Sequence, residues 1–301
     1  MASRKQLQLF DDHYDMLADG VRMTAYAEAI RRTVRPGDRV LDLGAGLGIL
    51  GFMALKAGAA HVYAVEKSDS IELARKLAAR NGLSDRVTFF HGNSRDFTLD
   101  EPVDVLLSET LGSFGVEENT LDFTLDARTR LLATGGRMIP GALRLWLAPV
   151  CQEEARAKVA FWQQVQGLDF SPAAYELLSR MAPADIGVAD LMARPQVFHD
   201  IDLAYNEQVA LDNTLVFPIL RPGTLYGVAG WFQVELCPGV QISTAPGAPP
   251  THWRQAVFPL REPVQVVLGD FLEVTLRIRP EGPRSDDTVV QLETRCTQVG
   301  K

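Results

Sequence analysis

The chain has 301 residues, of which 47% are hydrophobic and 23% charged. This balance is typical of a soluble globular protein and excludes global disorder, a collagen-like repeat and a coiled coil. The formal net charge of −8 argues against sequence-independent binding of nucleic acid, which needs many lysine and arginine side chains.

Three further observations concern the compartment. No apolar run is long enough to cross a bilayer, so we expect no membrane partner. The first residues lack the apolar segment of a secretory signal. Three cysteines, far apart in the chain, predict neither a disulfide framework nor a metal site. We therefore expect a reduced, cytoplasmic protein.

Up to Pro140, helical patterns alternate with short apolar runs. The spacing predicts helices over 21–34, 49–57, 70–81 and 119–132, and strands over 38–43, 61–66, 87–91 and 103–108. Such alternation is typical of a parallel sheet with helices on both faces. We therefore predict an α/β domain over residues 1–140.

After Pro140 the hydrophobic pattern changes to a period of two, which predicts antiparallel strands. The strands are expected at 143–147, 225–235, 264–268, 271–278 and 289–295. We predict a second domain over 141–301, a β-barrel or a sandwich. A helical insert at about 152–190 interrupts it and carries apolar Phe161, Trp162, Phe170, Tyr175 and Leu178.

A glycine-rich turn follows the first predicted strand, in the segment VLDLGAGLGIL at 40–50. Its G-x-G-x-G spacing lacks the third glycine position of the dinucleotide fingerprint, which disfavours NAD. The next strand ends in Glu66, whose carboxylate can accept hydrogen bonds from both hydroxyls of a ribose. With Asp42 before the turn, the pattern resembles the S-adenosylmethionine site of class I methyltransferases. A purely structural turn with a surface glutamate is the alternative.

Carboxylates are concentrated on the loop after the fourth predicted strand, in the segment LSETLGSFGVEEN at 107–119. Paired carboxylates can hold a metal, transfer protons or bind a cation. We expect no metal, because no nearby His or Asp completes a ligand set. A guanidinium is a natural target, since it is planar and binds carboxylates through two hydrogen bonds. Solvated side chains are the alternative.

Two more motifs complete the pattern: HYDMLADGVR at 13–22 and THW at 251–253. In this order and spacing, the four motifs resemble the protein arginine methyltransferase family over nearly the whole chain. The resemblance implies a Rossmann-like class I methyltransferase domain, then an antiparallel β-barrel domain with a helical dimerisation arm. It also implies a homodimer.

The resemblance further implies S-adenosylmethionine as the cofactor. Arg22 is expected to bind the carboxylate of its methionine end, Glu66 the ribose, and Asn93 and Ser94 the adenine. The full cofactor set is Met16, Arg22, Asp42, Gly44, Gly46, Glu66, Asn93, Ser94 and Glu109.

The same resemblance assigns the acceptor site. Glu109 and Glu118 are expected to hold the guanidinium, since the family spacing selects Glu118 rather than its neighbour Glu117. Asp19 and His252 are expected to pair across the domain junction, where they accept a proton or hold the N-terminal helix in place. Trp253 is expected to line the substrate channel, with ordinary packing as the alternative.

These features predict an S-adenosylmethionine-dependent N-methyltransferase that acts on arginine, in a protein or as the free amino acid. The alternatives are a methyltransferase for another amine or guanidine, and a non-catalytic scaffold that binds the cofactor. The chain departs from the family pattern at its start, where Ser3, Arg4 and Leu7 replace an aromatic stretch. Thr110 and Thr120 replace the family's frequent Trp and Met. The type of methylated product therefore stays open.

Overall fold

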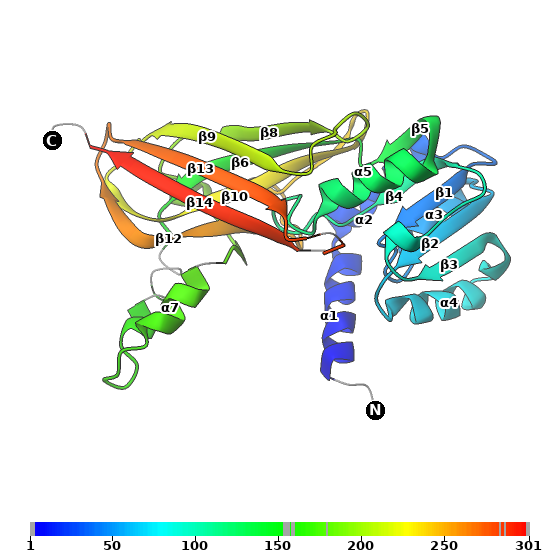
Figure 1. Cartoon of the computed structure of the whole chain (residues 1–301), viewed down its shortest axis with the longest axis horizontal. Helices are drawn as coiled ribbons and strands as arrows, with labels where there is room; N and C mark the ends of the chain where they lie inside the picture. The colour runs from blue at the N-terminus through cyan, green and yellow to red at the C-terminus, as the bar shows by residue number, and fades with distance from the viewer. Residues whose placement is uncertain are drawn as a thin grey trace.

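The computed structural model describes residues 4–152, 157, 160–178, 180–282, 284–285 and 287–298. They form an α/β unit followed by a unit of antiparallel sheets (Figure 1). The first unit is a five-stranded parallel sheet in the order β3-β2-β1-β4-β5. Its strands are β1 (Arg39–Leu43), β2 (His61–Glu66), β3 (Val87–His91), β4 (Val103–Ser108) and β5 (Leu132–Ile139).

The chain order of this sheet reverses beside β1, which pairs with β2 on one side and β4 on the other. Ligands of open α/β sheets bind at the carboxyl ends of the strands at such a reversal. The helices around the sheet are α2 (Gly20–Thr33), α3 (Ile49–Ala57), α4 (Ser70–Arg80) and α5 (Thr120–Leu131). The buried Tyr26 hydroxyl donates to the Ser108 carbonyl at 3.2 Å, which fixes α2 against the end of β4.

The second unit, called the β domain here, contains two antiparallel sheets in the orders β7-β12-β10-β6-β8 and β14-β13-β9, with β11 paired to β10. The sheets meet where β8 contacts β9 and β12 contacts β14, as closure into a barrel requires. The strands are β6 (Ala142–Val150), β7 (Ala182–Ala184), β8 (Gln196–Asp202), β9 (Leu211–Pro218), β10 (Gly223–Cys237), β11 (Val240–Ser243), β12 (Gln255–Val266), β13 (Phe271–Pro280) and β14 (Thr288–Thr297).

These two units confirm the predicted fold class. The parallel sheet ends with β5 at Ile139, and the β domain begins with β6 at Ala142. Within the described residues, no helix is both long and apolar enough to span a bilayer.

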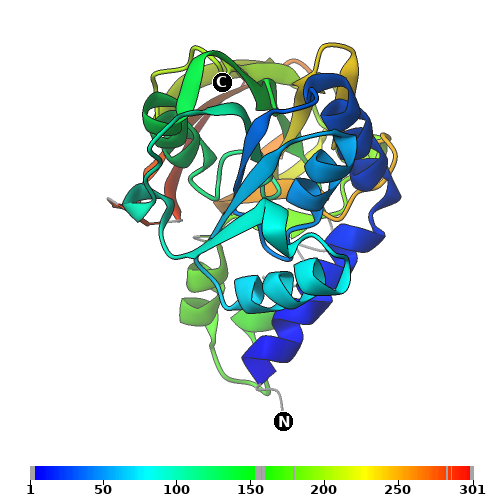
Figure 2. The ribbon, with the colours of Figure 1, turned by 90° about the vertical axis from the view of Figure 1, so that its right-hand side faces the viewer.

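The predicted helical insert at 152–190 is shorter than expected. Its described helical residues are 157, 160–163 and α7 (Ser171–Leu178), and the chain then enters β7, which pairs with β12 and so belongs to the β domain. Residues 153–156, 158, 159 and 179 lie outside the described residues, as do the side chains of Tyr175 and Leu178. Helix α1 (Arg4–Ala18) and the segment around α7 project from the same side of the molecule in both views (Figures 1 and 2).

Candidate functional site

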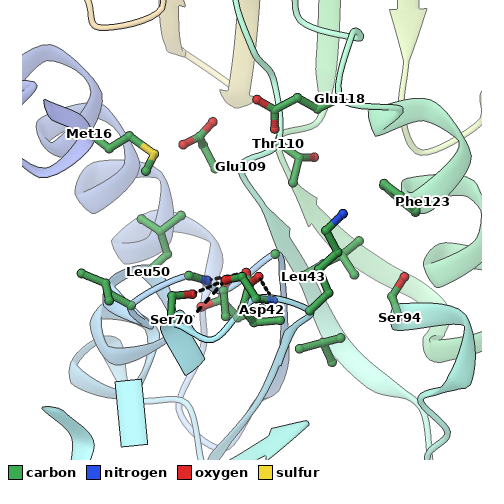
Figure 3. A pocket seen from close by; sticks show the side chains of 18 of the residues that line it. Met16, Asp42, Leu43, Leu50, Ser70, Ser94, Glu109, Thr110, Glu118 and Phe123 are labelled. Carbon is green, nitrogen blue, oxygen red and sulfur yellow. Dashed lines mark hydrogen bonds between the residues drawn. The ribbon is translucent and has the colours of Figure 1, made fainter. Parts of the chain in front are cut away.

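A cavity of about 410 Å³ lies at the carboxyl ends of β1, β2 and β4, where the strand order reverses. Its size is within the range of small-molecule sites. Figure 3 shows Glu109 and Glu118 in one part of it, with Asp42 and Ser70 at the opposite end. The lining includes all nine residues predicted for the cofactor, together with Glu118.

The glycine turn leaves no room for side chains on the cavity side. Gly44 and Gly46 have φ angles of +71° and +54°, which L side chains rarely adopt. A Cβ on Gly44 would lie 2.8 Å from the Thr110 side chain, and one on Gly46 would lie 2.9 Å from the His13 ring. Just before the turn, buried Asp42 accepts a hydrogen bond from the Gly51 N–H at 2.8 Å and so holds the start of α3.

Glu66, at the end of β2, holds the backbone of the glycine turn and of the loop that follows β2. Its Oε2 accepts from the Gly46 N–H at 2.9 Å, and its Oε1 accepts from the Ser68 N–H at 2.7 Å. Each carboxylate oxygen can accept a further hydrogen bond. The carboxylate is therefore both preorganised by backbone donors and suited to bind a diol.

Arg22 and Glu109 form a buried ion pair in the cavity wall. Arg22 Nε donates to Glu109 Oε2 at 2.8 Å, and Nη2 donates to the same oxygen. Both side chains are only 6% exposed. The sequence assigned Arg22 to the cofactor and Glu109 to both the cofactor and the acceptor, and the structure joins the two side chains directly. Glu109 thus already binds one guanidinium, that of Arg22.

The adjacent residues Glu117 and Glu118 occupy different environments. The Glu117 carboxylate is directed into its own loop, where it accepts hydrogen bonds from the backbone N–H groups of Ser113 and Phe114. Burial raises the pKa of Glu117 to about 8 against those hydrogen bonds, with a further increase from the charge of Glu118. Glu117 does not line the cavity.

The Glu118 side chain is exposed to solvent and lines the cavity. Its surroundings raise its pKa to about 7, first by desolvation and then by the negative charges of Glu109 and Asp287, while Lys67 acts in the opposite direction. A carboxyl group with a pKa near neutrality both exchanges protons readily at physiological pH and attracts a cation once ionised.

Asp19 connects the α/β unit to the β domain. Its Oδ1 accepts from the Arg22 N–H at 2.9 Å and caps α2. Its Oδ2 lies 2.9 Å from His252 Nδ1 and accepts from the His252 N–H at 3.0 Å. Burial acts to raise the pKa of Asp19, but these hydrogen bonds outweigh it and lower the pKa below its usual value. The expected pair therefore forms, although neither residue lines the cavity.

Trp253 also differs from its expected position on the substrate channel. Its side chain is 4% exposed and packs edge-on against Phe232, with ring centroids 5.3 Å apart. It lies in the hydrophobic core and not in the cavity lining. The indole fills part of the hydrophobic core. This position corresponds to ordinary packing, the alternative to a place on the substrate channel.

Several residues of the cavity lining have no predicted role. His13 lies in the HYDMLADGVR motif but received no role, and its buried Nε2 has no hydrogen-bond partner among the described residues. Lys67, Phe123 and Asp287 also line the cavity, and Asp287 belongs to the distant β13–β14 connection, which no local motif indicates. The described residues contain no cluster of side chains suited to a metal ion.

Two family models match this chain. The "arginine methyltransferase oligomerization subdomain" matches residues 142–298, and a "methyltransferase domain" matches residues 35–168. The chain belongs to the protein arginine methyltransferase family.

Individual members of the protein arginine methyltransferase family show the same likeness. The chain is 38% identical to the probable histone-arginine methyltransferase 1.4 of Arabidopsis thaliana, over 88% of this chain and 53% of that protein. It is 31% identical to protein arginine N-methyltransferase 1 of Schizosaccharomyces pombe, over 89% of this chain and 82% of that protein. The chain thus spans about half the length of the plant relatives it matches.

A solved structure extends the likeness to the fold. The Trypanosoma brucei PRMT1 enzyme-prozyme heterotetrameric complex with AdoHcy matches with a TM-score of 0.85 and 26% identity. The match covers 96% of this chain and 94% of that one.

Proposed function

We propose that this protein transfers a methyl group from S-adenosylmethionine to the guanidino group of an arginine, preferably one in a protein or peptide. The observation that carries the proposal is that one cavity contains Glu109 and Glu118 beside the glycine turn and Glu66. The turn and Glu66 fit a nucleoside, and the two glutamates fit a guanidinium. The names of the relatives, all arginine methyltransferases, agree with this acceptor.

The cofactor supplies an electrophilic methyl group on a sulfonium and leaves as the thioether S-adenosylhomocysteine. The protein holds the acceptor and polarises it. A guanidinium is a poor nucleophile because its positive charge is spread over three nitrogens. Glu118 and Glu109 draw that charge toward the nitrogens they bind, which leaves electron density on the nitrogen that forms the new N–C bond. Correct placement of the two reactants contributes several kcal/mol, within an upper range of about 7–11.

A proton must leave the methylated nitrogen. Glu118 is the acceptor that the structure favours, because it lines the cavity and its pKa is raised to about 7. The Asp19–His252 pair lies outside the lining, and we assign it the role of holding α2 against the β domain.

The test offers isotopically labelled S-adenosylmethionine with an arginine-rich peptide, free arginine or a cell lysate, and identifies products by mass spectrometry. We expect methylarginine from the peptide. Transfer only to free arginine, or to another amine, would replace the substrate class. Tight cofactor binding with no transfer to any acceptor would favour the scaffold alternative.

Replacing Glu66 by alanine should weaken binding of S-adenosylhomocysteine by roughly 1.5–3 kcal/mol, the usual value of hydrogen bonds to a charged group. Calorimetry measures the loss. Glu101→Ala is the matched control, since this carboxylate is 80% exposed and pairs only with Arg39. Unchanged affinity in a folded Glu66→Ala variant would refute the assigned ribose contact.

The value of kcat/KM should rise with pH through a limb near pH 7, because Glu118 must be ionised to attract the acceptor and its pKa is about 7. Below that limb the carboxyl group is protonated and activity falls. A pH series on the wild type and on Glu118→Gln checks this. A limb that persists in the variant belongs to another group.

We further propose that the protein is a homodimer. Phe161 and Phe170 are 58% and 39% exposed, and both rings contact Trp162. An exposed aromatic cluster on a projecting segment suits a two-fold contact. The oligomerization subdomain matched by residues 142–298 agrees with this. Light scattering should give twice the chain mass, and a stable monomer at micromolar concentration would contradict the proposal.

With three free thiols, we place the protein in the reducing cytoplasm.

A further inference from the structure

The connection between β13 and β14, together with the first residue of β14, is called the hairpin loop here (described residues 281, 282, 284, 285, 287 and 288), and it contacts the α/β unit on both sides of Glu118. The Thr288 hydroxyl donates to the Glu117 carbonyl at 3.1 Å. The Asn119 side-chain amide donates to the Ser285 carbonyl at 2.7 Å. Figure 1 shows this end of β13 and β14 as the end nearest the α/β unit. The residues immediately before and after Glu118 are therefore each bonded to the β domain.

Asn119 is well suited to this role. It is 2% exposed and has a φ angle of +57°, a left-handed conformation that asparagine tolerates better than most residues. It also immediately precedes the first residue of α5. A buried amide with a backbone acceptor holds its neighbours firmly, because breaking the bond would leave both groups unpaired.

The hairpin loop has one more contact with the α/β unit. Arg284 binds both carboxylate oxygens of Asp96, at 3.0 and 2.7 Å. Asp96 belongs to the short helix that begins at Ser94, on the adenine side of the cavity. This ion pair is half exposed and so contributes little energy. The bonds of Thr288 and Asn119 are therefore the main attachment of the hairpin loop to the segment around Glu118.

Within the described part of the chain the Glu118 side chain has no hydrogen bond or ion pair, so the bonds on either side of its backbone limit the region that its carboxylate can reach. We propose that Asn119 and Thr288 are positioning residues, through which the hairpin loop of the β domain places the Glu118 carboxylate at the acceptor site. The inference rests on the proposed function and adds that the α/β unit alone does not complete that site. Asp287, on the same loop, lines the same cavity.

The test compares Thr288→Val, which keeps the shape but removes the hydroxyl, with Thr288→Ser, which keeps the hydroxyl. Thr214→Val is the control, because its hydroxyl bonds Thr275 at 2.7 Å within the β domain. With an arginine peptide, Thr288→Val should lower kcat roughly three- to tenfold, as expected for one lost hydrogen bond. Thr288→Ser and Thr214→Val should stay near wild type, and all three should bind S-adenosylhomocysteine normally.

A second variant and a second readout separate positioning from general stability. Asn119→Gly keeps the left-handed backbone but removes the amide, and should lower kcat as Thr288→Val does. In both variants the acid limb of kcat/KM should move to lower pH. Glu109 and Asp287 raise the pKa of Glu118 while Lys67 lowers it, and loosening the hairpin loop withdraws Asp287. Weaker binding of the peptide to the protein saturated with S-adenosylhomocysteine should accompany the shift.

The outcomes are distinguishable. A wild type that methylates no arginine acceptor overturns the proposed function, and this inference with it. A wild type that is active, with Thr288→Val and Asn119→Gly matching it in kcat and in the pH limb, overturns the inference alone. Equal impairment of Thr288→Ser and Thr288→Val would also overturn it, since the loss would then not depend on whether the hydroxyl is present.

Discussion

Replacing Glu118 by glutamine should lower turnover at least about thirtyfold while cofactor affinity stays close to wild type. Glutamine keeps the size of the side chain but removes the charge that polarises the acceptor. Losing one partner of a desolvated charge pair commonly costs about 2–5 kcal/mol, and 1.4 kcal/mol corresponds to a factor of ten. Steady-state rates with an arginine peptide and calorimetry with S-adenosylhomocysteine measure the two quantities.

Glu117→Gln is the internal control for this prediction. The sequence predicts that it keeps most activity, with the unused glutamate either structural or solvated. In the structure its carboxylate accepts two backbone N–H groups, so glutamine, with one oxygen, loses one acceptor. We expect a lower melting temperature and a smaller loss of turnover than in Glu118→Gln. An inactive Glu117→Gln beside an active Glu118→Gln would mean that the acceptor glutamate is misassigned by one residue.

Glu109→Gln should behave differently from Glu118→Gln. Their shared role at the acceptor, taken alone, predicts the same loss of turnover with normal cofactor affinity for both. The ion pair between Glu109 and Arg22 changes that expectation, because the substitution leaves a buried guanidinium without its counter-charge. Glu109→Gln should therefore impair both turnover and binding of S-adenosylhomocysteine.

Replacing Arg22 by methionine should lower the free energy of unfolding by about 3–5 kcal/mol, the usual cost of leaving one charge of a buried pair uncompensated. It should also remove most affinity for S-adenosylhomocysteine, because Arg22 lines the cavity and is the residue expected to bind the carboxylate of the ligand. Urea unfolding and calorimetry provide the measurements.

The double variant Arg22→Met/Glu109→Gln is the matched test of that explanation. With both charges removed, stability should recover most of its loss, while methyl transfer should stay absent. Arg32→Met is the surface control, since its pair with Glu28 is largely exposed and should leave the unfolding midpoint near wild type. A double variant as unstable as Arg22→Met would show that Arg22 stabilises the protein through packing and not through charge.

Where hydrophobic periodicity is strong, the sequence predicts this fold well. The helix expected over 49–57 and the strand expected over 103–108 have the same bounds in the structure. The strand β5 was missed because it contains Gly135 and Gly136 and shows no clear alternation. The insert was predicted too long, because a three-residue strand such as β7 is defined by its partner β12 and not by its own residues.

The candidate site likewise has features that the sequence predicts and features that it does not. The residues predicted for the cofactor line one cavity, and most of them belong to compact motifs at the ends of adjacent parallel strands. The pairing of Arg22 with Glu109 could not be predicted, since 87 positions separate them and each has a plausible ligand of its own. Asp287 was missed for a similar reason, because only the pairing of β13 with β14 brings its loop to the cavity.

The raised pKa values of two neighbouring glutamates also link the fold to proton binding. The carboxyl groups of Glu117 and Glu118 have pKa values of about 8 and 7 in the folded protein, against an ordinary value of 4.5. The folded state thus retains protons that the unfolded chain releases, and its stability falls as pH rises from about 4.5 through those values. The pH that ionises Glu118 for catalysis is therefore a pH at which the loop is least stable. A bound guanidinium supplies the missing positive charge, so an arginine acceptor should stabilise the protein more at pH 8 than at pH 6.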